Sequence, residues 1–109
     1  MTILVQVADP AALLNSIKRL IDRREIETWA YDSDGDFYHT PQQWARKAWL
    51  RPQIAGSALN LKLIQRNDET LTKAVYGVYH GRFVEMLLTH FEGTVGSVQS
   101  TARQPTYAP

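Results

Sequence analysis

The segment Glu27–Thr40, ETWAYDSDGDFYHT, decides how this chain folds, because three aspartates alternate there around a glycine. Such a pattern is typical either of a calcium loop or of a tight turn between two β-strands. The flanking residues, ETWAYD and FYHT, are rich in aromatic and β-branched side chains, which favours strands. Between them, Asp34-Gly35 is a strong signal for a two-residue type I′ turn, whose central positions both need a positive φ. We therefore predict a hairpin in which Ser33 faces Asp36, Tyr31 faces Tyr38 and Trp29 faces Thr40.

The calcium interpretation fails on spacing. An EF-hand loop needs a glycine at its sixth position and a bidentate glutamate at its twelfth. Counted from Asp32, those positions hold Phe37 and Gln43. We expect the aspartates to turn the chain and to remain hydrated, and we predict no metal site. Weak binding of a cation by the three carboxylates is the alternative.

Upstream of the hairpin, ADPAALLNSIKRLIDRRE predicts a helix over about residues 10–24. Asp9 suits the N-cap position, and Pro10 suits the first helical position because its missing N–H is not needed there. Apolar residues recur at helical spacing at Leu13, Ile17, Leu20 and Ile21. The preceding residues 2–7, TILVQV, are β-prone and form either an edge strand or an extended arm.

Downstream, the sequence predicts a short helical turn and a second hairpin. Pro41 begins the turn, which extends to about residue 46. Residues 47–54 and 58–66 then form two strands, joined through Gly56. Leu59, Leu61 and Leu63 alternate with polar residues and point to the core. Pro52 indicates that the first strand lies at an edge or is interrupted there.

Residues 67–93 predict a long helix whose apolar residues cover more than half of its circumference, which is typical of a helix packed on two sides. Gly77 and Gly81 lie one turn apart and leave a smooth surface, either for close packing against the first helix or for a dimer contact. Residues 94–109 are small, polar and proline-bearing, and we expect a flexible tail.

Together these elements predict an α+β fold in one domain, residues 1–93. A four-stranded antiparallel sheet of two hairpins carries both helices on one face. The other face stays open, and by alternation it holds Trp49, Arg51, Lys62 and Arg66. A sheet face with basic and aromatic groups is a candidate binding surface.

Charge and composition narrow the class of protein. The net charge is +1, but residues 37–67 carry five basic residues and no acidic one. This stretch either attracts a polyanion or is balanced in space by acidic residues elsewhere. The chain has no cysteine, which excludes disulfides and thiolate chemistry. Without a membrane-length apolar run or a signal pattern, we expect a cytoplasmic protein with no membrane association.

Candidate catalytic residues are few. His80, Glu85 and His90 share the long helix, but five-residue steps rotate each by about 140° from the last, so they do not converge on a metal. A small enzyme that uses His39 or His80 is the weakest hypothesis, and we predict no cofactor. Tyr76, Tyr79, His80 and Arg82 form either a polar-aromatic rim beside the glycines or tyrosines packed in the core.

The sequence thus favours a small non-enzymatic bacterial module for binding or regulation. We expect it to act through protein–protein contact, with a protein partner or as a homodimer. The open sheet face is the first candidate surface, and the Gly77/Gly81 side of the long helix is the second. The alternative is a nucleic-acid-binding domain that uses the basic, aromatic sheet face.

Overall fold

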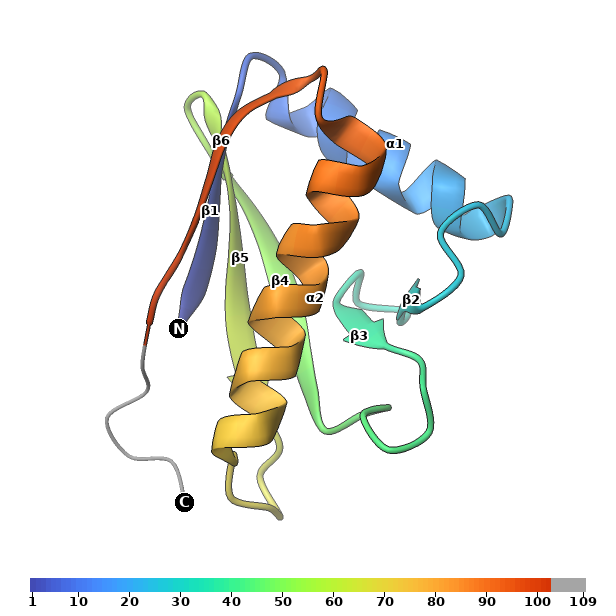
Figure 1. The fold of residues 1–109 in the computed structure, drawn as a ribbon, viewed down its shortest axis with the longest axis vertical. Helices are drawn as coiled ribbons and strands as arrows, with labels where there is room; N and C mark the ends of the chain where they lie inside the picture. Colours follow the sequence, from blue (N-terminus) through green and yellow to red (C-terminus); the bar gives the residue numbers. More distant parts are fainter. Residues whose placement is uncertain (103–109) are drawn as a thin grey trace.

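The structure is a computed structural model that describes residues 1–102, and its fold is α+β. Six antiparallel strands form one curled sheet in the order β2-β3-β4-β5-β1-β6, and α2 runs across its concave side (Figure 1). Along the chain the elements are β1 (Thr2–Val7), α1 (Pro10–Asp22), β2 (Trp29–Tyr31), β3 (Phe37–His39), β4 (Ala48–Ala55), β5 (Ala58–Gln65), α2 (Lys73–Phe91) and β6 (Val95–Ser100).

One core lies between the two helices and the inner face of the sheet. The predicted alternation in β5 is confirmed, because Leu59, Leu61 and Leu63 are all buried. The predicted start of α1 is confirmed as well: the Asp9 carboxylate accepts the N–H of Ala12 at 3.0 Å. The centre of the core is aromatic, with Trp29 packed edge-on against the rings of Tyr79 and Phe83.

The prediction of four strands was wrong, because two further strands join the sheet. β1 is neither an edge strand nor a free arm: it lies inside the sheet, between β5 and β6. β6 comes from residues that we expected in a flexible tail. Its sequence, VGSVQS, lacks strong alternation, so its place depends on pairing with β1, whose paired residues lie 88 to 97 positions away in the chain. The remainder of the expected tail, residues 103–109, lies outside the described residues.

The first hairpin exists, but its predicted register was wrong by one residue. Tyr31 pairs with Phe37, and Trp29 pairs with His39. The loop is longer than a type I′ turn: the N–H of Gly35 bonds to the carbonyl of Asp32, and only Gly35 has a positive φ, of 83°. The Asp32 carboxylate also accepts the N–H groups of Asp34 and Asp36, both at 3.0 Å. This side-chain capping favours a three-residue loop with a bulge at glycine.

The second hairpin has the predicted turn at Gly56, whose φ is 60°. Pro52 lies in β4 beyond the point where β3 pairs with it, since the only described pair between these strands is Phe37 with Leu50. Hydrogen-bonded and non-hydrogen-bonded pairs alternate along β4 and β5, and Pro52 belongs to a non-hydrogen-bonded pair. Its nitrogen therefore points to the unpaired side of β4, where a missing N–H costs the sheet no hydrogen bond. β4 is therefore an edge locally, as the proline indicated.

The long helix begins later than expected. Its N-cap is Thr72, whose hydroxyl accepts the N–H of Val75 at 3.2 Å, so residues 67–71 precede the helix. Upstream of β4, residues 41–47 form hydrogen-bonded turns in place of a regular helix. Neither of the described helices combines the length and apolar character needed to cross a membrane.

Candidate functional site

The outer, convex face of the sheet carries three of the four residues expected on it. Trp49 and Arg51 of β4 alternate with the buried Ala48 and Leu50, and Lys62 of β5 lies opposite Arg51. Trp49 is half-buried and Lys62 is exposed. Arg66 follows the end of β5 and lies at the rim of this face. On the inner side of β4, Leu50 is buried, whereas Ile54 is 51% exposed near the hairpin tip.

A shallow hollow of about 490 Å³ lies at the end of this face where β5 leaves the sheet. Trp49 and Ile64 supply its apolar surface, and they are direct cross-strand neighbours. The residues that line the hollow are Arg46, Trp49, Ile64, Gln65, Arg66, Asn67 and Asp68. A half-buried indole beside polar and charged groups is the combination that protein-binding surfaces concentrate.

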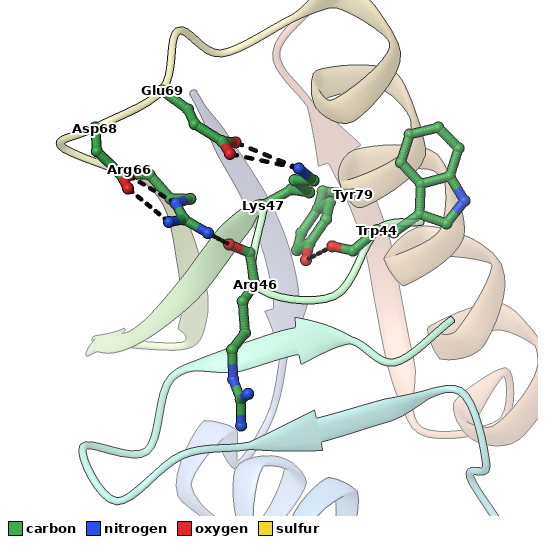
Figure 2. Close-up of polar contacts among 7 residues, drawn as sticks. All are labelled: Trp44, Arg46, Lys47, Arg66, Asp68, Glu69 and Tyr79. Carbon is green, nitrogen blue, oxygen red and sulfur yellow. Dashed lines mark hydrogen bonds and ion pairs between the residues drawn. The ribbon is translucent and has the colours of Figure 1, made fainter. Parts of the chain in front are cut away.

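Arg66 and Arg46 fix the rim of the hollow. Both nitrogens of the Arg66 fork bond to the Asp68 carboxylate at 2.7 Å, and a third donates to the carbonyl of Arg46 at 3.2 Å (Figure 2). The Arg66 guanidinium lowers the pKa of the Asp68 carboxyl. The Arg46 side chain points away from this pair and lies 5.5 Å over the ring of Tyr38 on β3. Arg46 adopts a left-handed backbone with a φ of 58°.

Acidic partners balance most of the basic stretch. Lys47 lies 3.5 Å from Glu69, and Arg66 pairs with Asp68 (Figure 2). Arg51 binds Asp36 through two nitrogens, at 3.1 and 2.8 Å. Three of the five positive charges of residues 37–67 therefore have a carboxylate partner, from either the first or the last third of the chain, whereas Arg46 lies over the Tyr38 ring.

The three aspartates of the first hairpin come close enough to share a cation, with carboxylate oxygens within 4.8 Å of one another. Two of the three carboxylates, those of Asp32 and Asp36, already accept hydrogen bonds within the fold. Asp32 holds the loop, and both oxygens of Asp36 face the Arg51 guanidinium. The ammonium group of Lys18 also lies near the loop, 5.4 Å over the ring of Tyr31. A metal ion would have to displace these contacts, which favours the structural role.

Three residues of the predicted second surface lie in the core. Tyr76, Tyr79 and His80 are 6%, 0% and 4% exposed, so they form no rim, and only Arg82 of that set reaches solvent. The core interpretation of the two tyrosines fits the structure. The Tyr79 hydroxyl donates to the carbonyl of Trp44 at 2.6 Å (Figure 2), and the Tyr76 hydroxyl contacts Thr101.

The buried histidines have the geometry of structural groups. His39 Nδ1 lies 2.7 Å from the carbonyl of Thr28, and its ring packs 4.6 Å from that of Trp29. His80 Nδ1 lies 2.7 Å from the carbonyl of Tyr76, and its ring stacks on Tyr76 at 4.1 Å. Burial lowers the pKa of both imidazoles, so both are neutral at pH 7. Neither histidine is among the residues that line the outer-face hollow.

Gly77 and Gly81 do not pack against α1, which was one of the two roles predicted for them. Both are exposed, and within the described residues no heavy atom outside the local helix lies within 4 Å of a Cβ placed on either. Tyr38, Arg46 and Ile64 lie at or beside the hollow and were not predicted as binding residues. Alternation along β5 could have placed Ile64 on the outer face. The position of Arg46 could not be predicted in this way, because it depends on a backbone turn that no local sequence pattern indicates.

Comparisons with known proteins assign no family. No model of a protein family matches the chain, and neither the curated proteins nor the solved structures include a significant match.

Proposed function

We propose that this chain is a small non-enzymatic binding module that contacts a partner protein through the hollow on the outer face of its sheet. The observation that carries the proposal is a half-buried Trp49 and Ile64 set among arginines that are already oriented by local contacts. Trp, Tyr and Arg dominate the energetics of protein interfaces, because the rigid aromatic rings bury large areas and the guanidinium supplies several donors in a fixed plane. Trp49 and Arg46 line the hollow, and Tyr38 lies beside it, under the Arg46 guanidinium.

The ion pairs favour a protein over a nucleic acid. Binding to a polyanion draws on cations that exchange small counterions for phosphates. On this face Arg51 and Arg66 are engaged with carboxylates, and the Arg46 guanidinium lies over an aromatic ring. A phosphate backbone would have to compete with these contacts, whereas a protein surface can bury the indole and leave the pairs intact.

Photo-crosslinking tests the proposal in the cells from which the chain comes. A photoreactive phenylalanine analogue at Gln65 places the probe in the hollow. The matched control is the same analogue at Gln53, an exposed outer-face position near the other end of β4. We expect one protein adduct from position 65, none from position 53, and loss of the adduct when Trp49→Ala is added.

Two results would contradict the proposal. One is the same set of adducts from both positions, which would mean non-specific encounter. The other is an adduct that nuclease removes, together with binding of a labelled single strand that weakens steeply with salt; that pair of results would favour the nucleic-acid alternative. Thermal unfolding of each variant, compared with the parent chain, checks that the fold is retained.

A further inference from the structure

β6 is an edge strand without the usual features that prevent pairing with another chain. It pairs with β1 on one side, and within residues 1–102 no strand covers its other side (Figure 1). Natural edges are protected by charge, proline or short length. The other edge of this sheet, β2, has only three residues and precedes an acidic loop. β6 has six residues, VGSVQS, none of them charged and none of them proline.

The free side of β6 presents backbone groups at regular spacing. Thr101 donates its N–H to the carbonyl of Thr2 at 3.0 Å, which makes these two residues a hydrogen-bonded pair. Because such pairs alternate along an antiparallel ladder, Gln99 bonds to Leu4, and the N–H and C=O groups of Val98 and Ser100 point away from β1. Two residues at positions i and i+2 with outward donors and acceptors are what an added antiparallel strand recognises.

A flank of α2 that is small and apolar from Gly77 to Leu88 lies beside this edge, with Lys73 one turn before Gly77. Tyr76 reaches Thr101 at the end of β6, whereas Arg82 and Glu85 lie on the flank of α2 that faces His39 and β3. At about 100° per residue, the flank beyond Tyr76 and His80, on the side of β6, carries a row of small and apolar residues. They are Gly77, Gly81, Val84 and Leu88, of which Leu88 is 50% exposed.

We propose that two copies of the chain pair antiparallel through β6 and form a two-fold dimer with one continuous sheet. Gln99 then faces its own equivalent, and Val98 of each copy exchanges hydrogen bonds with Ser100 of the other. A two-fold contact requires a surface that is complementary to itself. β6 meets this requirement because it is neutral, and the adjoining flank of α2 places apolar residues against the same residues of the partner copy. This contact is separate from the outer-face hollow, so either proposal can fail without the other.

The experiment measures the mass of the full chain in solution by sedimentation equilibrium. The monomer is 12.4 kDa, and we expect twice that mass. Ser100→Pro removes an outward N–H that β1 does not use, once in each copy. We expect it to raise the dissociation constant on the order of tenfold or more. Gln99→Lys places like charges opposite each other and acts in the same direction, whereas the matched control Ser97→Lys adds the same charge without facing itself and leaves the dimer intact.

A further variant separates the edge from the helix. Leu88→Lys weakens the dimer if the α2 flanks approach each other, and a side chain that is half exposed tolerates the change. Circular dichroism of each variant verifies the fold. A monomeric mass up to the solubility limit would overturn the proposal. So would a dimer that both Ser100→Pro and Gln99→Lys leave unchanged, because the interface would then lie elsewhere.

Discussion

Arg24 and Arg46 adopt left-handed backbone conformations that usually favour glycine, with φ of 62° and 58°. Arg24 follows the C-cap of α1, and its N–H bonds to the carbonyl of Ile21. A residue with a Cβ costs about 1 kcal/mol in this conformation. Arg24 is exposed at the end of a helix, where glycine is the usual residue, whereas Arg46 lies at the rim of the binding hollow.

Arg24→Gly is therefore expected to stabilise the protein. The free energy of unfolding should rise by about 0.5–1 kcal/mol, since glycine removes the strain while the exposed arginine side chain is lost at little cost. Urea unfolding measures the change. Arg23→Gly is the control: its φ is −83°, so glycine relieves nothing there and should reduce stability. Equal effects at both positions would show that the backbone of Arg24 is not strained.

Tyr79 shows how one hydroxyl connects three segments. It donates to the carbonyl of Trp44 at 2.6 Å and accepts the N–H of His39 at 3.3 Å, and its side chain is fully buried. Tyr79→Phe leaves both backbone groups without this partner in the core, so we expect a loss of roughly 1–3 kcal/mol in the free energy of unfolding. Tyr38→Phe, on the outer face, should change it by less than about 0.5 kcal/mol. Guanidinium unfolding of both variants makes the comparison, and a smaller loss for Tyr79→Phe would mean that water replaces the hydroxyl.

At the scale of elements, local signals predicted those parts of the fold that depend on neighbours in the chain. Asp9 and Pro10 marked the start of α1, and Gly56 marked the second turn. The first hairpin was predicted, but its register was not, because the Asp32 side chain caps two N–H groups and lengthens the loop. The prediction used only the Asp34-Gly35 pair, which does not include the contact from the Asp32 side chain.

The packing of α2 on the sheet buries His80, and this makes stability depend on pH. Its Nδ1 lies against the carbonyl of Tyr76, its Nε2 is buried without a described partner, and the nearby N-terminal amine is positive. Burial lowers the pKa of His80 below the value of about 6.5 that it has in the unfolded chain. Below about pH 6.5 the unfolded state therefore binds more protons than the folded state. The contribution of neutral His80 to the free energy of unfolding is fully present above that pH and is lost as the pH falls.

His80→Phe keeps the stacked ring and removes the titrating group. We expect the free energy of unfolding of this variant to fall less than that of the parent between about pH 7 and pH 5. Some of the fall should remain, because burial also lowers the pKa of His39. His90→Gln, at an exposed position of α2, should keep the pH profile of the parent. Parallel profiles for His80→Phe and the parent would exclude His80 as the source of the pH dependence.

At the scale of the whole molecule, strands from the two ends of the described chain lie side by side and complete one side of the sheet. β1 and β6 pair although their paired residues are 88 to 97 positions apart, and β1 places Ile3, Val5 and Val7 in the core. We predicted that the domain ends at residue 93, because the residues that form β6 are small and polar apart from two valines. Its strand character comes from the unpaired side of β1 and from contacts with α2, and neither is a local property.

The same reason explains the outcome for the candidate site. Alternation within β4 and β5 predicted that Trp49, Arg51 and Lys62 share the outer face, because that property is local to each strand. The ion pair between Arg51 and Asp36 joins β4 to the loop of the first hairpin through tertiary contact, and the spacing of these residues in the sequence does not predict it. The long helix was predicted to be covered on two sides, whereas its glycines face open space in the described structure. That exposed flank lies on the side of β6.

Two truncated chains test the role of β6. A chain of residues 1–102 retains every described element and should unfold at the same temperature as the full chain. A chain of residues 1–93 loses β6, the only described partner on one side of β1, and also the contact of Tyr76 with Thr101. Because the buried face of β1 would then border an open edge, we expect a loss of several kcal/mol, a large share of the stability typical of small domains. Thermal unfolding followed by circular dichroism distinguishes the outcomes: if residues 1–93 unfold as cooperatively and at the same temperature as residues 1–102, then β6 lies on the sheet without supporting it.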